Sequence, residues 1–571
     1  MPYRAPVKEM AFYLDKVLDA GRISQTERFA EATPDMTVAI LGEAARLSEE
    51  ILAPLNVAGD LHPAYLENGV TRCSPGFEAG YKAIAEGGWV GMSGDPEFGG
   101  MGLPLALTSC VGEMMSSACL SLALNPLMTQ GQIEALEHHA SDEIKALYLP
   151  KLISGQWTGT MNLTEAGAGS DVGALRSKAE DNGDGTYSVT GQKIFISWGD
   201  HDIAENICHL VLARLPDAAA GTKGISLFLV PKFLPDADGN PGVANNASAI
   251  SLEHKMGLHG SPTAIMEFAG ATGWMIGPEG GGMAAMFTMM NNARIGVGIQ
   301  GLSQAEAATQ KALEYATERK QGRSPIEGGT GTILDHADVR RNIMTMKTLT
   351  LSARAIILDA AISSDLAKGL DGDAAKTQAA RAAFLTPIAK AFGTDTGCQV
   401  AEIGVQVHGG MGYIEETGAA QFYRDVRVTT IYEGTNGIQA MDMVGRKLKD
   451  GGAAAFAILD EISLTVKTAE AETPDLAAFL TGAEACLKAT IHWMVDAPMN
   501  DRFAGAAPFL RAFALALGGH YLLKAAMVDA SRMPFARFHI RQTMQQVDGL
   551  CSAAREGASS LYALDADALG A

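Results

Sequence analysis

The sequence predicts an α+β protein of several domains, in which helical regions flank a central β domain. Three observations support this prediction. The chain has 571 residues, which is too long for one hydrophobic core. Short β-prone runs are confined to a central region that begins near residue 156. Long segments with small and apolar residues at helical spacing lie before and after that region, so we expect helical domains on both sides of it.

The first part of the chain has a helical pattern with few strand signals. Turn residues interrupt it at Gly21 and at Thr33-Pro34, and Thr33 or Asp35 is placed to cap the helix that follows. A glycine-rich stretch over residues 87–104 predicts a loop with several backbone bends. The helices expected here are, in order, residues 11–53 with those interruptions, 77–85, 105–124 and 130–152.

The central region changes to short β-prone runs separated by turn residues. Asn182-Gly183-Asp184-Gly185 and Asp238-Gly239-Asn240-Pro241 are typical turn sequences. The strands expected between such turns are residues 187–197, 207–213, 225–230 and 264–268. Together they predict a β domain of about 115 residues inserted between helical segments.

After Gly282 the helical pattern returns, and its length and spacing predict a helical bundle. The expected helices are residues 284–319, 336–363 and 376–407, with a loop over residues 321–332. A further stretch of about 120 residues, rich in Ala and Leu, predicts an additional set of packed helices. The domain boundaries that we expect are 1–35 (N-terminal extension), 36–157, 158–278, 279–450 and 451–571.

Composition and charge restrict the function. The chain is 47% hydrophobic and 19% charged, with a formal charge of −21 and no long basic run. Nucleic acids and anionic membranes attract clusters of Lys and Arg, so neither is expected as a main partner. An anionic substrate held by a few placed cations remains compatible with this charge. No charge-free apolar run approaches the roughly 20 residues that span a bilayer.

The seven cysteines are scattered, with no CxxC pair and no metal-ligand spacing to histidine. Because their number is odd, we expect reduced thiols and not a disulfide framework. We expect no metal site. The first residues lack the apolar core of a signal peptide, which favours a cytoplasmic protein.

The segment Tyr432-Glu433-Gly434-Thr435 is the most informative motif. Between Val426 and Ile438 the only other charged residue is Arg427, so Glu433 is expected to lose part of its hydration. Desolvation disfavours a carboxylate and raises its pKa toward the range in which it works as a general base. On its own, the motif is equally compatible with a glutamate at the start of a helix.

Three other segments carry possible chemistry. Residues 162–171 place small residues between polar groups, so that backbone N–H groups can approach a ligand closely. Strand alternation puts Phe195 and Ser197 on one face, as a wall for a planar heterocycle. Residues 406–413 form a glycine-rich break after a long helix, and Arg319 stands at a helix end. The alternative interpretations are a polar turn for residues 162–171, a core aromatic for Phe195, a helix C-cap for residues 406–413 and, for Arg319, a cation that offsets a helix dipole.

Taken in order, these segments resemble the acyl-CoA dehydrogenase family. The resemblance runs from about Gly87 to Lys447 and includes residues 91–103, 163–171 and 424–439. It implies an N-terminal helical domain, a middle β-barrel or sandwich domain and a C-terminal four-helix bundle, with FAD between the last two. The residues beyond Lys447 then form an extra helical domain.

The resemblance also implies roles for individual residues. Glu433 matches the catalytic base; the position on an earlier helix where some relatives place the base is Ala293 here, which cannot take a proton. Phe195 stands where relatives often carry Trp. The implied FAD contacts are Leu163, Thr164, Gly169, Ser170, Phe195, Ser197 and Thr435, and, from a neighbouring subunit, Arg319, Gln406, Gly409 and Gly410. The implied substrate contacts are Ser170, Arg294, Tyr432 and Gly434.

The implied reaction forms a trans-2-enoyl-CoA from an acyl-CoA, with electrons passed on to an electron-transfer flavoprotein. The start of the sequence and the long C-terminal region resemble a bacterial subgroup that oxidises a short thioether substrate, 3-methylmercaptopropionyl-CoA. Short- or medium-chain acyl-CoA oxidation, an acyl-CoA oxidase and a non-catalytic scaffold are the alternatives. A homodimer is favoured over a tetramer, and membrane association is not expected. Acyl-chain length depends on helix packing around residues such as Met114, Met115 and Met286.

Overall fold

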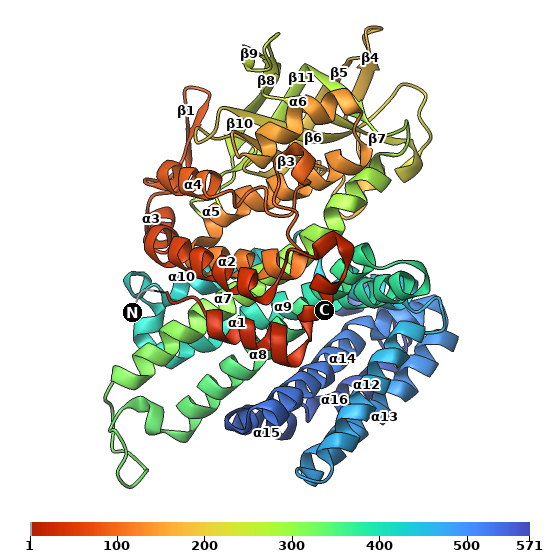
Figure 1. The fold of residues 1–571 in the computed structure, drawn as a ribbon. Helices are drawn as coiled ribbons and strands as arrows, with labels where there is room; N and C mark the ends of the chain where they lie inside the picture. The colour runs from red at the N-terminus through yellow and green to blue at the C-terminus, as the bar shows by residue number, and fades with distance from the viewer. Residues whose placement is uncertain (1–2, 571) are drawn as a thin grey trace.

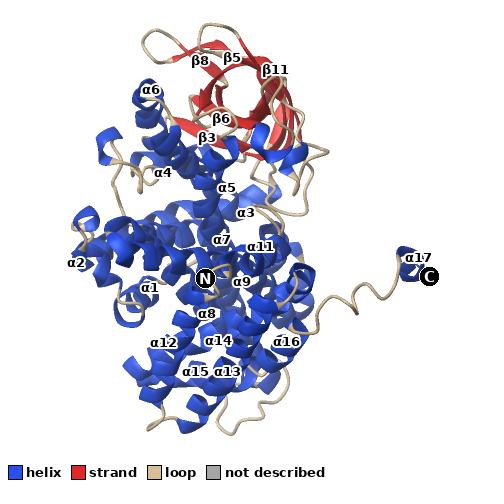
Figure 2. Cartoon of the chain, turned by 90° about the vertical axis from the view of Figure 1, so that its right-hand side faces the viewer, coloured by secondary structure: helices blue, strands red, loops and turns tan. Residues whose placement is uncertain are grey.

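The computed structural model describes residues 3–570, apart from the side chains of residues 289–292. A β domain lies at one end of the molecule, and helices form the rest (Figures 1 and 2). This is the α+β arrangement that the sequence predicts, with additional helices after the bundle. Within the described residues, His, Cys, Asp and Glu form no group of three that could hold a metal ion.

The N-terminal region is helical and contains a small β-hairpin. Its helices are α1 (Val7–Phe12), α2 (Pro34–Arg46), α3 (Leu55–Leu61), α4 (Phe77–Glu86), α5 (Leu105–His139) and α6 (Asp142–Ile153), and its strands are β1 (Tyr65–Glu67) and β2 (Val70–Arg72). The Thr33 side chain caps α2 by accepting a hydrogen bond from the N–H of Met36. This satisfies one of the free donors at the helix start, as the sequence predicts.

The expected break between residues 124 and 130 is wrong. Helix α5 continues through Pro126 to His139, with a non-helical backbone only at Cys119. The break lies instead at Ser141, whose side chain caps α6. Most of α5 is buried between neighbouring elements, so its packing outweighs the local cost of a proline inside a helix.

The β domain contains nine strands, which extend well beyond the four predicted runs. They are β3 (Trp157–Asn162), β4 (Lys178–Asp181), β5 (Tyr187–Ser197), β6 (Asn206–Arg214), β7 (Ile225–Pro231), β8 (Phe233–Pro235), β9 (Pro241–Ala244), β10 (Ala247–Leu252) and β11 (Thr263–Ile276). Seven form one sheet in the order β10-β11-β5-β4-β6-β3, and β7 pairs with both β11 and β6. This double pairing closes the ring seen in Figure 2. Buried apolar side chains, including Val189, Phe228 and Phe268, fill the closed sheet.

Three long helices dominate the C-terminal bundle. They are α7 (Gly282–Glu318), α8 (Ala337–Gly369) and α9 (Gly372–His408), followed by the shorter α10 (Ala419–Val426) and α11 (Asn436–Asp442). Helix α5 packs against α7. Gly298 and Gly301 of α7 have no room for a side chain, because an added Cβ would lie 2.4–2.6 Å from backbone atoms of α9. This close approach explains why small residues recur along both helices.

The residues after the bundle fold against it. They form α12 (Ala453–Ala469), α13 (Pro474–Asp496), α14 (Met499–Val528), α15 (Met533–Phe538), α16 (Gln546–Ala554) and α17 (Ala566–Gly570). Helix α14 packs against α8 and α11. The guanidinium of Arg532 lies 3.7 Å from the ring centroid of Phe12 and pairs with Glu9, which joins the two ends of the described chain.

Two helices, α5 and α14, are long and apolar enough to cross a membrane by length and composition. Their most apolar windows are 89% and 83% buried inside the protein. All seven cysteines are unpaired thiols.

Candidate active site

Glu433 lies on a strained turn immediately before α11. Its φ is +55°, and Gly434 follows with φ +79°, so two consecutive residues adopt the left-handed region. A non-glycine residue in this region costs energy and persists only where its surroundings hold it. The Thr435 side chain caps α11 by accepting from the N–H of Ile438. The turn therefore presents the glutamate just outside the positive end of a helix.

The side chain of Gln439 holds this turn from one helical turn away. Its Nε2 donates to the carbonyl oxygen of Glu433 at 3.1 Å and, more weakly, to that of Gly434 at 3.4 Å. Gln439 is fully buried. The backbone direction at Glu433 is consequently fixed by a side chain that solvent does not reach.

Charges around Glu433 act in opposite directions. Desolvation raises the pKa of the Glu433 carboxyl, whereas the nearby cations Arg294 and Lys390 lower it. Arg294 is 5% exposed, and its Nη1 lies 3.5 Å from Oδ2 of Asp442. Burial lowers the pKa of Lys390 to about 8. A base with a raised pKa beside two buried cations is typical of a site for proton transfer.

Lys390 also belongs to a hydrogen-bond network that ties α11 to α9. Its Nζ donates to Oδ1 of Asn436, the first residue of α11, at 2.9 Å. The Nδ2 of Asn436 donates in turn to Oδ1 of Asp395 at 2.7 Å and to Oγ1 of Thr394 at 3.0 Å. Lys390 is also one of three cations, with Arg511 and Arg427, that lower the pKa of Asp395 against the effect of burial.

Tyr432 anchors the other side of the turn. Its hydroxyl donates to Oε1 of Gln300 on α7, and burial raises the pKa of this phenol. The residue is therefore a neutral donor that fixes the turn against the bundle. It stands next to Glu433, as expected from the sequence.

The loop of residues 163–170 is held by a buried ion pair. Glu165 accepts from Lys193 Nζ at 2.9 Å, from Ser177 Oγ at 2.6 Å and from backbone N–H groups, and Lys193 Nζ also donates to the Leu163 carbonyl at 3.1 Å. Lys193 is fully buried, and desolvation lowers its pKa to about 8. The pKa of Glu165 falls to about 2, because the nearby Lys193 and the hydrogen bonds outweigh the effect of burial.

Beyond that ion pair the loop is open. Leu163 and Thr164 are partly buried, whereas Gly169 and Ser170 are exposed. A Cβ added at Gly169 would meet no atom within 4 Å. Packing inside this chain therefore does not require a glycine there, and the position leaves room for a ligand.

Phe195 is held out of its strand by an unusual backbone. Its φ is +62°, β5 bulges here so that Ile194 and Phe195 lie opposite the single residue Ile265 of β11, and Phe195 is 60% exposed. Trp198 anchors the strand end: it is fully buried and donates from Nε1 to the carbonyl of Ser121. An exposed aromatic on a strained, anchored strand is a ready surface for a flat heterocycle. Ser197 is partly buried on the same strand.

The end of β5 is connected to the segment that carries Glu433. Ser197 pairs with Thr263 on β11, and the loop before β11 docks on α10, where the N–H of Leu258 donates to Oδ1 of Asp425 at 2.6 Å. Asp425 is buried, which raises its pKa to about 6. The β domain thus contacts α10, the helix that precedes the Glu433 turn in sequence.

Arg319, Gln406, Gly409 and Gly410 lie elsewhere. Arg319 follows the last residue of α7, whereas the first residue of that helix, Gly282, packs against β7. A helix of 37 residues spans about 55 Å. Tyr315 stacks on His408 at 4.5 Å, so the end of α9 lies beside the end of α7. Within one chain Arg319 therefore lies a full length of α7 from β7, and the end of α9 lies beside the end of α7.

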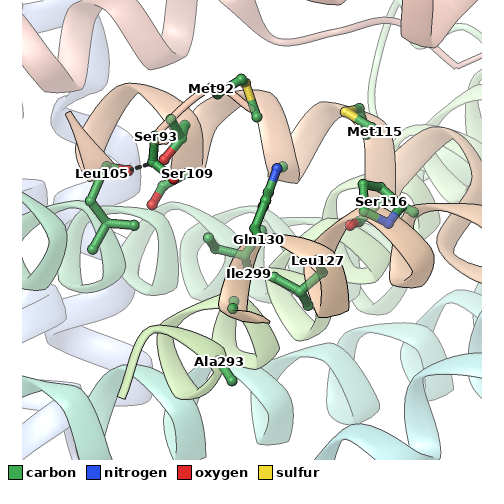
Figure 3. Close-up of a pocket in the computed structure, with 16 residues that line it drawn as sticks. Met92, Ser93, Leu105, Ser109, Met115, Ser116, Leu127, Gln130, Ala293 and Ile299 are labelled. Carbon is green, nitrogen blue, oxygen red and sulfur yellow. Dashed lines mark hydrogen bonds between the residues drawn. The ribbon is translucent and has the colours of Figure 1, made fainter. Parts of the chain in front are cut away.

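A small cavity of about 80 Å³ lies between α5 and α7 (Figure 3). Its lining combines the thioether side chains of Met92 and Met115 with the polar side chains of Ser93, Ser109 and Gln130. The Ser109 hydroxyl is buried and has no hydrogen-bond partner. Ala293, the neighbour of Arg294 in sequence, lines the same cavity. Met114 and Met286 are fully buried outside it.

The chain thus combines a desolvated carboxyl at Glu433 with an exposed aromatic side chain, Phe195, on the β domain. Acyl-CoA dehydrogenase family models match residues 62–156 (N-terminal domain), 160–271 (middle domain) and 280–448 (C-terminal domain). The chain therefore belongs to the acyl-CoA dehydrogenase family, whose members are FAD-dependent oxidoreductases.

Known proteins extend this similarity over nearly the whole chain. The 3-methylmercaptopropionyl-CoA dehydrogenase of Ruegeria pomeroyi is 43% identical over 520 residues, which cover 89% of this chain and 88% of that one. A broad-specificity linear acyl-CoA dehydrogenase of Mycobacterium tuberculosis is 34% identical, with coverages of 81% and 78%. Caenorhabditis elegans ACDH-11 in complex with C11-CoA has a similar fold, with a TM-score of 0.78 and 21% identity, covering 94% of this chain and 91% of that chain.

The sequence analysis did not predict a role for three residues of this site. They are Lys390, Gln439 and Lys193, the last of which pairs with Glu165. Lys390 did carry a signal. It is a single lysine within the apolar stretch 388–392 of a long helix, where a buried charge needs a partner. Gln439 lay within the quoted motif but had no sequence feature to separate it from its neighbours.

Proposed function

We propose that this chain oxidises a short acyl-CoA, with Glu433 as the catalytic base, and that its substrate is 3-methylmercaptopropionyl-CoA. The observation that carries this proposal is the desolvated Glu433 carboxyl on a strained turn beside Arg294 and Lys390. The role of the base is to remove an α-proton from the thioester. Bound FAD supplies the acceptor for the hydride from the β-carbon.

The residues of the chain account for the remaining requirements. An α-proton of a thioester becomes acidic enough only when donors stabilise negative charge on the carbonyl oxygen. The backbone N–H of Glu433 is our candidate donor, because Gln439 fixes the carbonyl side of the same turn. Arg294 and Lys390 keep Glu433 ionised before the reaction despite its desolvation.

The observed surfaces fit FAD. Phe195 offers an exposed aromatic wall, and the open loop of residues 163–170 offers backbone donors and room at Gly169. We assign Leu163, Thr164, Ser170, Ser197 and Thr435 to the same ligand, in keeping with the sequence prediction. The length of α7 supports our assignment of Arg319, Gln406, Gly409 and Gly410 to the FAD of another copy. We therefore propose that the working enzyme is a homodimer.

The lining of the cavity favours a short, polarisable acyl group. Two methionine sulfurs, the free Ser109 hydroxyl and the Gln130 amide line it. A thioether fits such a mixed surface better than a long alkyl chain, which gains most from a wholly apolar lining. The name of the Ruegeria relative supports the same substrate. Relatives named butyryl-CoA dehydrogenase, at 35% identity, favour butyryl-CoA as the second candidate.

The first test is an anaerobic titration of the purified protein with 3-methylmercaptopropionyl-CoA and, separately, with butyryl-CoA. We expect both to bleach the visible flavin absorption, and the thioether substrate to do so at lower concentration. A stronger response to butyryl-CoA would overturn the substrate assignment. A yellow protein that neither compound bleaches would overturn both candidates, and a protein that takes up no FAD would overturn the whole proposal.

The electron acceptor that we propose is an electron-transfer flavoprotein. One similar structure, at 26% identity and a TM-score of 0.60, bears the name of an electron transferring flavoprotein of Acidaminococcus fermentans. We expect turnover to depend on such an acceptor and to form little hydrogen peroxide in air. Rapid peroxide formation with substrate alone would identify an oxidase. The seven free thiols support a reducing, cytoplasmic location.

Loss of the Lys193–Glu165 ion pair should weaken FAD binding. In Lys193→Met, the partly buried Glu165 carboxylate loses its cationic partner, and the loop of residues 163–170 loses the hydrogen bonds from Lys193 Nζ to Glu165 and to the Leu163 carbonyl. We expect a lower melting temperature and faster release of FAD, measured by flavin fluorescence. Lys178→Met, at an exposed position on the neighbouring strand β4, is the matched control. Equal FAD release from both variants would contradict the prediction.

A further inference from the structure

The last part of the described chain stands apart from its own body. Ala558 is the last buried residue, and its N–H donates to Oδ1 of Asp501 at 2.8 Å. Residues 559–570, which we call the arm, are all exposed. The hydrogen bonds recorded for the arm join it only to itself or to Ala558. Figure 2 shows α17 at the end of a loop that extends away from the other helices.

The composition of the arm is that of a contact surface. Leu561, Tyr562, Leu564 and Leu569 are between 56% and 71% exposed. Segments that remain solvated are poor in large apolar residues and rich in Pro, Ser, Glu and Lys, whereas the arm contains no proline and no lysine. Its only charged residues are Asp565 and Asp567. An apolar and acidic arm is suited to an apolar and basic surface.

A surface of that kind surrounds the point where the arm begins. Met441, Arg446, Lys449 and Met499, which we call the root patch, are all exposed. Met499 Sδ lies 3.8 Å from the position that a Cβ would take at Gly445, so α14 and the end of α11 contribute to one surface. Asp501, which holds Ala558, is two residues from Met499.

We propose that in a twofold pair of chains the arm of each copy lies on the root patch of the other. The arm leaves its own root patch and points away from it, so its apolar side chains remain uncovered unless a second body is present. Twelve extended residues reach up to about 40 Å. One chain supplies both the arm and the patch, and a twofold axis near the root satisfies both contacts at once. This proposal rests on the two-copy assembly proposed above.

A photo-crosslink distinguishes contact between copies from contact within one. We would place p-benzoylphenylalanine at Tyr562 in FAD-loaded enzyme, mix ¹⁴N- and ¹⁵N-labelled protein, allow exchange, irradiate and analyse the peptides. We expect mixed-isotope crosslinks from residue 562 to peptides that contain residues 441–449 or 499–503. Crosslinks only within one isotope, or to other surfaces, would overturn the proposal.

Removal of residues 560–571 provides the second test. We expect subunit exchange, followed by native mass spectrometry of the isotope mixture, to become at least about tenfold faster, because the arm contact slows dissociation. Ser559→Ala with Ser560→Ala, which keeps every apolar side chain, is the control. We expect the double variant Asp565→Lys with Asp567→Lys to exchange subunits faster than the wild type. When Lys449→Asp is added to the same chain, the rate of exchange should return to that of the wild type. An unchanged dimer after truncation would overturn the arm contact alone, whereas a monomeric wild type would overturn the assembly as well.

Discussion

Replacing the candidate base, Glu433→Gln, should abolish turnover while leaving the fold and the flavin in place. Glutamine keeps the size of the side chain and its tolerance of the turn, but it cannot accept the α-proton. General-base catalysis contributes about 10²–10⁴-fold to rate, so we expect kcat to fall by at least about 10²-fold. Stopped-flow measurement of flavin bleaching gives this rate without contributions from the electron acceptor.

The control is Glu402→Gln, which changes an exposed glutamate on α9. It should bleach at the wild-type rate. The flavin spectrum of Glu433→Gln should match that of the wild type, since Gln439 and Thr435 hold the turn through backbone groups that the substitution leaves intact. If Glu433→Gln bleaches within about tenfold of the wild-type rate, another group takes the proton and the assignment fails.

The wild-type pH profile tests the same carboxyl. Desolvation raises the pKa of Glu433 above the usual value of a glutamate, and only the ionised form accepts a proton. Activity should therefore rise with pH through that raised pKa, and the acid limb of kcat/KM should lie above pH 4.5. An acid limb at or below the usual value would show that desolvation does not control the base.

Local patterns predicted the elements that surround the site better than the way they close around it. Alternation gave the strand of residues 187–197 with the bounds that the structure has, because its turns are marked by glycine and aspartate. The ring closure through β7, which pairs with both β6 and β11, has no local signal, since it depends on contacts far apart in sequence. The continuation of α5 through Pro126 also has no local signal, because it depends on burial that outweighs helix propensity.

The features of the site likewise divide into those that the sequence predicts and those that depend on the assembled fold. Glu433 was predictable, because an isolated carboxylate in an apolar stretch implies desolvation. The positive φ of Glu433 and the hydrogen bond from Gln439 to its carbonyl were not predictable, because both depend on how α11 packs against the bundle. The separation of Arg319 from β7 also required the structure, because the pattern predicts a long helix but not its direction relative to the barrel.

Lys390→Met should change the pH dependence of the reaction as well as its rate. At neutral pH the positive charge of Lys390 lowers the pKa of Glu433, so its removal should raise that pKa. Because only ionised Glu433 accepts a proton, the acid limb of kcat/KM should move to higher pH, with the largest loss of activity on the acid side. The groups that remain around Lys390 are Asp395, Glu433, Arg294 and Cys398, of which only Arg294 is cationic.

A purely structural role for Lys390 would lower activity equally at every pH, so the position of the acid limb decides between the two roles. Lys390→Arg should restore that position, because it returns the charge, even where its longer side chain does not reproduce the 2.9 Å hydrogen bond to Asn436. Lys376→Met, at an exposed position on the same helix, should leave the profile unchanged. An acid limb of Lys390→Met that coincides with the wild type would exclude charge control of Glu433 by Lys390. The network of Asn436 and Asp395 would then serve only to hold the start of α11.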